Sequence, residues 1–123
     1  MPEQKTVMIA DDERSMRLLI RASLGSATYR FLEASSGPEA LDLARRERPD
    51  LLLLDVGLPG LDGYAICRAL KAERETAELK VIMITARARD TDRDEALSAG
   101  ADGYVVKPFS PAVLQSDLRG YLA

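Results

Sequence analysis

The sequence contains no histidine and a single cysteine, Cys67. Without histidine, the chain can neither carry a phosphohistidine nor use an imidazole as a base, so any histidine chemistry must come from a partner. One cysteine cannot form a disulfide within the chain, which favours a reducing compartment. Its apolar neighbours Ile66 and Leu70 indicate that Cys67 is a small core residue.

Long hydrophobic runs and an excess of positive charge are also lacking. No apolar run approaches the roughly 20 residues that cross a membrane, and the N-terminus has no basic segment followed by an apolar one, as secretion signals do. These absences predict a cytoplasmic protein without a membrane partner. The net charge of −3 lacks the basic excess typical of nucleic-acid-binding surfaces, so no direct nucleic-acid binding is expected.

The composition is that of one ordinary globular domain. The 123 residues are 46% hydrophobic and 30% charged, which is enough to bury a core without disulfide or metal staples. We find no internal repeat, low-complexity segment or linker. The sequence therefore predicts a single domain over residues 1–123.

Short apolar runs alternate with segments of helical period. Continuous runs of four or five apolar residues suit strands that are covered on both faces. Such strands are predicted at residues 7–10, 29–32, 51–54, 81–84 and 104–106. Five alternating strand–helix units indicate an α/β fold with a parallel sheet and helices on both faces.

Capping signals support these helices. Ser36 and Glu39 have the spacing of a capping box. Gly25 and Gly100 are placed to end helices in a left-handed conformation, and Ser110 to begin the last helix.

Polar residues follow four of the predicted strands. Asp11 and Asp12 follow the first, Asp55 the third, Thr85 the fourth and Lys107 the fifth. Because the carboxyl ends of parallel strands share one edge of the sheet, where ligands bind at the point of strand-order reversal, we expect these side chains to lie close together.

Three carboxylates at one edge need a cation. Two like charges about 4 Å apart repel by roughly 4 kcal/mol at an effective dielectric constant near 20. An all-oxygen site with room for water suits Mg²⁺ better than zinc. Lys107 is suited to bind a phosphate oxygen, and Thr85 to donate a hydrogen bond to another. The cluster therefore predicts a site for a magnesium-bound phosphoryl group.

Asp55 is the predicted phosphorylation site. A carboxylate can act as a nucleophile and form an acyl phosphate. Asp55 stands alone after the leucine run 51–54, which indicates a buried central strand, whereas Asp11 and Asp12 are left to hold the metal. Each residue also has an ordinary interpretation: the two aspartates could simply begin a helix, and Thr85 and Lys107 could be structural. Their combination favours the site.

Four segments, in this order and spacing, resemble the receiver domain of two-component response regulators. The resemblance covers residues 7–122, and the segments are "IADDE" at 9–13, "LLLLDVGLPGLDG" at 51–63, "VIMITA" at 81–86 and "GADGYVVKPF" at 100–109. It implies a doubly wound, flavodoxin-like (βα)5 fold with strand order 2-1-3-4-5. It also implies a signalling domain that assists its own phosphorylation and dephosphorylation, rather than an enzyme.

The resemblance implies a role for each residue of the cluster. Asp55 is the phosphoacceptor and a metal ligand, Asp12 a direct Mg²⁺ ligand, and Asp11 an assisting ligand that acts through water. The backbone carbonyl of Gly57 is a further metal ligand. Lys107 is the phosphate-binding lysine, in a cis bond to the proline that follows it.

The resemblance also implies a switch and its partners. Thr85 is the switch hydroxyl, and Tyr104 is the aromatic residue that changes rotamer with it, although a tyrosine at a strand start could simply pack. The phosphoryl group comes from a sensor histidine kinase or a histidine phosphotransfer protein. The face around the fourth helix, fifth strand and fifth helix then controls an output domain or protein. The chain is either a complete regulator or the N-terminal part of a longer one.

Two departures from common receiver patterns bear on lifetime and dimerisation. Gly57 and Arg87, two residues after Asp55 and Thr85, occupy positions that tune phosphoryl lifetime, so the lifetime stays open. Gly103 replaces the second acid of the "ADDY" pattern found in regulators that dimerise, which weakens the case for a phosphorylation-dependent dimer.

Two other functions remain as alternatives. A hydrolase that forms an aspartyl-phosphate often has a second acid two residues after the nucleophile, and Gly57 at that position argues against it. An interaction module with a dormant site would lack magnesium binding.

Overall fold

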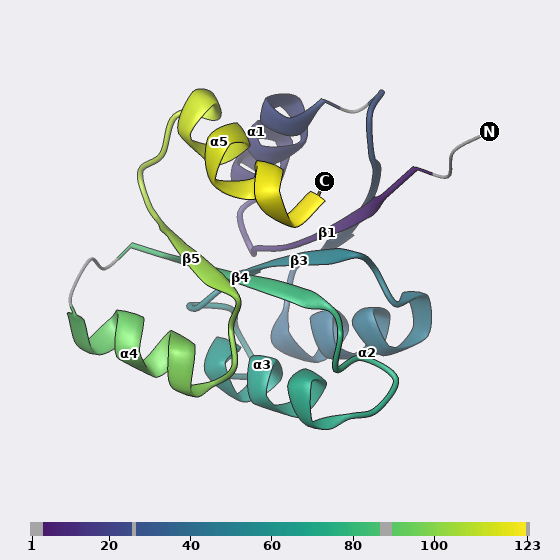
Figure 1. Cartoon of the computed structure of the whole chain (residues 1–123), viewed down its shortest axis with the longest axis vertical. Coiled ribbons are helices and arrows are strands. Elements are labelled where there is room, and N and C mark those ends of the chain that lie inside the picture. Colours follow the sequence, from purple (N-terminus) through teal and green to yellow (C-terminus); the bar gives the residue numbers. More distant parts are fainter. Residues whose placement is uncertain (1–3, 26, 87–89, 123) are drawn as a thin grey trace.

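The computed structural model describes residues 4–25, 27–86 and 90–122, apart from the side chains of residues 90–92. In this part of the chain, five parallel strands form one sheet of order β2-β1-β3-β4-β5 (Figure 1). The strands are β1 (Thr6–Ala10), β2 (Arg30–Ala34), β3 (Leu51–Asp55), β4 (Lys80–Thr85) and β5 (Gly103–Val106). The predicted α/β fold and its strand order are confirmed.

Five helices cover the two faces of the sheet. They are α1 (Arg14–Leu24), α2 (Gly37–Glu47), α3 (Gly63–Ala72), α4 (Asp90–Ser98) and α5 (Pro111–Leu122). Helices α1 and α5 lie on one face, and α2, α3 and α4 lie on the other (Figure 1). Right-handed crossovers explain why α1 lies on the face opposite α2, α3 and α4, because the chain runs one way along the sheet from β1 to β2 and the opposite way from β2 to β5.

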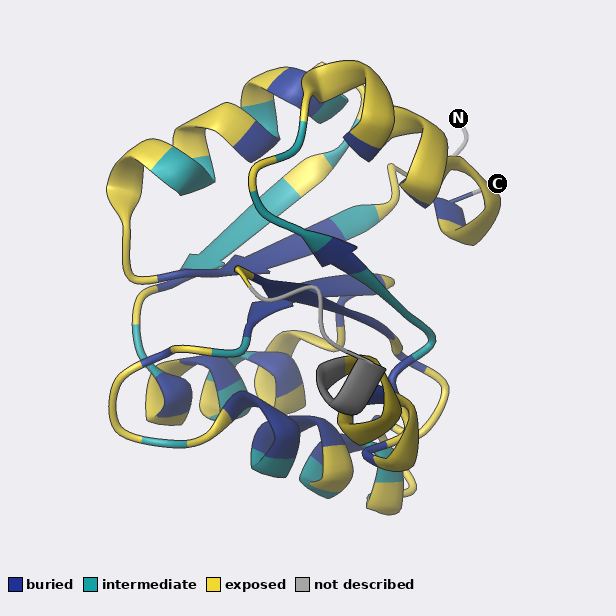
Figure 2. Ribbon diagram, turned by 90° about the vertical axis from the view of Figure 1, so that its left-hand side faces the viewer, coloured by how far each residue is buried: buried dark blue, intermediate teal, exposed yellow. Residues whose placement is uncertain are grey.

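The two faces of the sheet carry two separate cores. Along β3, Leu52 and Leu54 pack into the core beneath α2, α3 and α4, whereas Leu51 and Leu53 pack into the core beneath α1 and α5. All four leucines have 0% of their surface exposed. Figure 2 shows the buried central strands between half-exposed helices. The leucine run is therefore a central strand whose alternate side chains fill both layers.

Strand β2 begins one residue later and ends two residues later than predicted. Parallel pairing with β1 extends it, because Glu33 and Ala34 lie opposite Ile9 and Ala10. Arg17 and Arg21 of α1 bind the Glu33 carboxylate at 2.9 and 2.7 Å. This pairing allows a charged residue in a strand, which an apolar pattern alone does not predict.

The predicted helix-end signals at Ser36, Gly25, Gly100 and Ser110 are present, with one difference. Ser36 Oγ accepts a hydrogen bond from the Glu39 N–H at 3.3 Å, and Ser110 Oγ caps α5 in the same way. Gly25 and Gly100 have φ values of 94° and 93°. The Glu39 carboxylate, however, returns to the N–H of residue 35 rather than to that of Ser36.

The turn before β5 is held by Asp102. Its carboxylate accepts hydrogen bonds from Lys71 Nζ and the Val81 N–H, both at 2.8 Å, and its carbonyl accepts one from Tyr121 Oη at 2.8 Å. A Cβ at Gly103 would lie only 2.8 Å from Tyr121 Oη. Tyr121 thus fills the space in which the second acid of "ADDY" would begin.

None of the helices within the described ranges is long and apolar enough to cross a membrane. The predicted cytoplasmic location stays a prediction.

Gly63 sets how closely α3 approaches the end of β3. A Cβ at Gly63 would lie 3.0 Å from both the Asp55 carbonyl oxygen and Val56 Cα. We expect Gly63→Ala to lower the free energy of unfolding by about 1–3 kcal/mol, because backbone atoms must move apart. The matched control is Gly120→Ala in α5, where no atom lies within 4 Å of the added Cβ and a stabilisation of up to about 1 kcal/mol is expected. Urea titrations measure both, and equal effects would contradict the packing argument.

Candidate functional site

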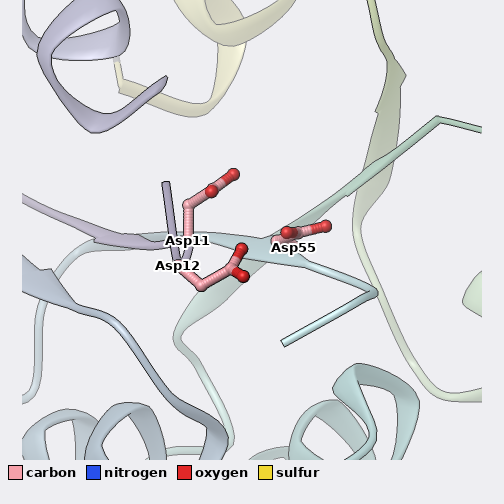
Figure 3. Close-up of side chains that lie close together, drawn as sticks. All are labelled: Asp11, Asp12 and Asp55. Carbon is pink, nitrogen blue, oxygen red and sulfur yellow. The ribbon is translucent and has the colours of Figure 1, made fainter. Parts of the chain in front are cut away.

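The three predicted carboxylates meet at the carboxyl edge of the sheet. Asp11 and Asp12 directly follow β1, and Asp55 is the last residue of β3. One carboxylate oxygen from each lies within 4.8 Å of the others. Figure 3 shows the Asp12 and Asp55 side chains beside that of Asp11 at this edge. Asp11 is fully buried and Asp55 is 8% exposed, whereas Asp12 is exposed.

Backbone contacts fix the position of Asp11. Its N–H donates to the carbonyl of Ala34 at 3.0 Å, which extends the β1–β2 pairing. Its Oδ1 accepts from the Glu13 N–H at 2.8 Å, and its carbonyl accepts from Arg17 Nη1 at 2.7 Å. Asp11 Oδ2 remains directed to the site, where it binds Lys107.

Lys107 neutralises part of the cluster. Its Nζ lies 3.1 Å from Asp11 Oδ2 and 3.7 Å from Asp55 Oδ2. Burial acts to lower the pKa of Lys107, but the hydrogen bond to Asp11 and the nearby carboxylate charges outweigh it, so the pKa is raised. The lysine is therefore a permanent cation shared between two carboxylates.

Asp55 is held in an environment that disfavours its charge. Burial raises the pKa of its carboxyl group above the ordinary value, and the charges of Asp11 and Asp12 add to this effect. The Gly57 N–H, which donates to Asp55 Oδ1 at 3.1 Å, and Lys107 act in the opposite direction. The raised pKa means that the site gains from any further positive charge placed beside Asp55.

A pocket of about 390 Å³ opens beside Asp55. Residues from five separate segments of the chain contribute to its wall. The described lining residues are Asp55, Val56, Gly57, Tyr64, Thr85, Ala86, Glu95 and Lys107. The pocket therefore brings Asp55, Gly57, Thr85 and Lys107 of the predicted site together.

Thr85 and Lys107 reach the pocket from the ends of two neighbouring strands: Thr85 is the last residue of β4, and Lys107 directly follows β5. Thr85 is 5% exposed at the end of β4, and its carbonyl accepts the Lys107 N–H at 2.7 Å. The Lys107–Pro108 peptide bond is cis, as the resemblance implied.

Tyr104 lies outside the pocket beside Asp55. It is opposite Met83 in the β4–β5 pairing, two residues before the Thr85 position, so Tyr104 and Thr85 share one face of the sheet. Its partly buried side chain packs against the core beneath α2–α4. It also lines a second pocket of about 370 Å³ between α4, β5 and α5.

Four pocket residues were not predicted from the sequence, and two of them, Tyr64 and Glu95, have polar side chains. Tyr64 follows Gly63 at the start of α3 and is 6% exposed, and Glu95 lies on α4. The sequence of α4 has no apolar stripe that would show which of its residues face the pocket. Arg87, predicted to bear on phosphoryl lifetime, lies outside the described residues.

The donor set fits magnesium. All candidate ligands are oxygen atoms: the three carboxylates and the carbonyl of Gly57, a residue whose N–H donates to Asp55 Oδ1. Asp12 is open to solvent, which leaves room for the water molecules that Mg²⁺ usually retains. No nitrogen or sulfur ligand of the kind zinc prefers belongs to the acidic cluster found among the described residues.

Comparisons with known proteins agree with this geometry. The family model of the response regulator receiver domain matches residues 7–119. The probable transcriptional regulator ycf27 of Porphyra purpurea is 41% identical over 120 residues, which cover 98% of this chain and 48% of that protein. The chain thus spans about half the length of the curated relatives it matches.

Solved structures show the same fold. The chemotaxis response regulator CheY4 of Vibrio cholerae matches with a TM-score of 0.91 and 29% identity, covering 98% of this chain and 100% of that one. The receiver domain of the sensor histidine kinase PA1611 from Pseudomonas aeruginosa, with a magnesium ion coordinated in its active-site cleft, matches with a TM-score of 0.87 and 33% identity over 98% of each chain. The chain belongs to the response regulator receiver domain family of two-component systems.

Proposed function

We propose that this chain is a magnesium-dependent phosphoacceptor switch. Asp55 accepts a phosphoryl group from a phosphohistidine on a sensor histidine kinase or a histidine phosphotransfer protein. The observation that carries the proposal is the placement of the buried Asp55 carboxylate beside two further carboxylates and 3.7 Å from Lys107 Nζ, at the mouth of an open pocket. The chain's lack of histidine requires the donor to be a partner.

The chemistry is a transfer between two protein side chains. An Asp55 carboxylate oxygen attacks phosphorus, the bond from phosphorus to the donor histidine nitrogen breaks, and its electron pair stays on that nitrogen. Lys107 is placed to bind a phosphoryl oxygen as a fixed positive charge. Thr85, which lines the same pocket, offers its hydroxyl to another oxygen.

Asp11, Asp12, Asp55 and the Gly57 carbonyl would hold Mg²⁺. When bound, the ion neutralises charge on the carboxylates and on the incoming phosphoryl oxygens. Asp12 is the exposed member and Asp11 is already bound to Lys107, which supports Asp12 as the direct ligand and Asp11 as the assisting one.

Phosphorylation would then change the face formed by α4, β5 and α5. Thr85 moves toward the phosphoryl group, and Tyr104, on the same face of the sheet, follows into the space behind it. Moving the switch from 1:99 to 99:1 requires about 5.5 kcal/mol of differential stabilisation. New charge-assisted hydrogen bonds of about 1.5–3 kcal/mol each can supply it. Relatives named as transcriptional regulators are twice as long, which supports an output domain as the controlled partner.

A stable dimer through this face has less support. Asp102 is bound within its own chain to Lys71, and Gly103 offers no second carboxylate. A hydrolase function is also disfavoured, since Gly57 supplies no acid to protonate a leaving group.

Phosphoryl uptake from a small acyl phosphate tests the proposal. With Mg²⁺, intact-mass measurement is expected to show the gain of one phosphoryl group per chain, and peptide mapping should locate it in residues 51–63. Chelation of the metal should prevent the gain, because three carboxylates then face the anionic donor. Uptake that persists in full without divalent metal, or more than one phosphoryl group per chain, would contradict the proposal.

A further inference from the structure

We propose that Glu95 orients the water molecule that removes the phosphoryl group from Asp55, and that it thereby sets the lifetime of the phosphorylated state. The inference rests on the proposed phosphorylation of Asp55. It assigns a role to a residue of α4 outside the acidic cluster formed by Asp11, Asp12 and Asp55.

The placement of Glu95 carries the inference. Among the described residues that line the pocket beside Asp55, Glu95 is the one carboxylate other than Asp55 itself. Asp11 and Asp12 are not among the residues that line this pocket. Glu95 is thus the further acid on the wall of the pocket into which a phosphoryl group on Asp55 would project.

Besides Glu95, the pocket wall carries the hydroxyl groups of Tyr64 and Thr85, and the proposed function assigns that of Thr85 to a phosphoryl oxygen. Gly57 has no side chain, and a Cβ built there would have only Asp55 Oδ1 within 4 Å, at 3.9 Å. Ala86 is likewise apolar. Lys107 carries donors only, and its charge is committed to Asp11 and Asp55. The Glu95 carboxylate, which accepts hydrogen bonds, therefore suits a water molecule that must keep a lone pair free for phosphorus.

The packing of α4 holds Glu95 in this position. Ala96 and Ala99 are 2% and 3% exposed, so this side of the helix lies against the core. The Glu95 carbonyl accepts the Ala99 N–H at 3.0 Å, which places Glu95 in the last turns of the helix. Glu95 and its neighbour Asp94 are both exposed, and of the two Glu95 lines the pocket.

The reaction balances without a further reactant. The water oxygen forms a bond to phosphorus, the bond between phosphorus and the Asp55 oxygen breaks, and the electron pair returns to the Asp55 carboxylate. Both water protons end on the released phosphate, as dihydrogen phosphate. Glu95 accepts a hydrogen bond from the water and directs its oxygen to the side of phosphorus opposite the breaking bond.

The test measures the loss of the phosphoryl group separately from its uptake. Wild type, Glu95→Ala, Glu95→Gln and the control Asp94→Asn are loaded with a small acyl phosphate and Mg²⁺, the donor is removed, and the phosphorylated fraction is followed by intact mass. We expect loss of the phosphoryl group to slow about tenfold in Glu95→Ala, which corresponds to about 1.4 kcal/mol of barrier height. Glu95→Gln should slow it less, because the amide oxygen still accepts a hydrogen bond. Asp94→Asn should match wild type.

A second measurement distinguishes water orientation from charge repulsion. Beryllofluoride mimics a phosphoryl group and is not hydrolysed, so its affinity in the presence of Mg²⁺ should be the same in Glu95→Gln and wild type. Tighter binding by Glu95→Gln would show that Glu95 merely repels the anion. Unchanged loss in Glu95→Ala, or slower loss in Asp94→Asn, would also overturn the inference. If wild type takes up no phosphoryl group at all, the proposed function fails first and this inference falls with it.

Discussion

Asp55→Asn is expected to abolish magnesium-dependent phosphoryl uptake and to leave the fold at least as stable as that of wild type. The amide cannot act as the anionic nucleophile, and no other carboxylate of the cluster lines the pocket beside Asp55. The amide has nearly the volume of the carboxylate, so the packing at the end of β3 is retained. Loss of function and loss of structure are thereby separated in one variant.

The stability difference should depend on pH in a defined direction. Burial raises the pKa of the Asp55 carboxyl in the folded state, so its ionisation opposes folding. The penalty is absent below the ordinary carboxyl range near pH 3.9, where the group is protonated in both states, and it develops as pH rises through the raised pKa. In metal-free buffer, Asp55→Asn should therefore be the more stable protein at neutral pH, and this advantage should vanish on acidification.

Intact mass after acyl-phosphate treatment measures the loss of phosphoryl uptake. Thermal unfolding between pH 3.5 and 7.5 measures the pH-dependent difference in stability. Asp42→Asn is the matched control, because Asp42 is an exposed residue of α2 whose ion pair with Arg46 lies on the surface. The control should take up one phosphoryl group and lack the pH-dependent advantage. Phosphoryl uptake by Asp55→Asn within residues 51–63 would show that Asp55 is not the acceptor.

The fold was predictable because its strands are short, apolar and evenly spaced. Four of the five predicted runs lie wholly within strands of the sheet, and the fifth, 29–32, differs from β2 only at its ends. The residues that follow four of the runs meet at one edge. The parallel arrangement brings these residues together, because every strand ends at the same edge of the sheet. The sequence alone could thus predict that Asp11, Asp55 and Lys107 lie close together.

What the sequence did not reveal depends on packing between distant segments. Lys107 Nζ lies 3.1 Å from Asp11 Oδ2 and 3.7 Å from Asp55 Oδ2. The spacing of residues along the sequence does not predict such distances. Glu95 lies on a helix without an apolar stripe, so only the contact of α4 with the sheet shows that this residue faces the pocket. The sequence shows Tyr64 only as an ordinary helix residue. The close approach of α3 to the end of β3 places it in the pocket wall.

Leu53→Ala is expected to lower the free energy of unfolding by about 3–5 kcal/mol. Leu53 has none of its surface exposed and lies between Ile9 and Ile82 in the core beneath α1 and α5. A central strand clamped between two others cannot collapse into the space that the substitution leaves. The loss would be a large part of the roughly 5–15 kcal/mol typical of a whole domain.

Urea titration measures this loss against two comparison variants. Leu18→Ala removes the same atoms from a side chain of α1 that is 53% exposed, and it should change stability by less than about 0.5 kcal/mol. Ile82→Val, in the same core as Leu53, should cost about 0.5–1.5 kcal/mol and remains measurable if Leu53→Ala fails to fold. Equal costs for the Leu53 and Leu18 variants would contradict the assignment of β3 as the buried centre of the sheet.

The folded fraction of Leu53→Ala should still accept a phosphoryl group. Leu53 faces the α1–α5 core, whereas Asp55 is held by its pairing with Ile84 of β4 and by the Val56 N–H, which donates to the Ile84 carbonyl at 3.0 Å. These backbone bonds lie beyond the cavity that the substitution creates. Phosphoryl uptake per folded molecule should therefore match that of wild type. The leucine run stabilises β3, whereas the backbone bonds at the edge of the sheet set the position of Asp55.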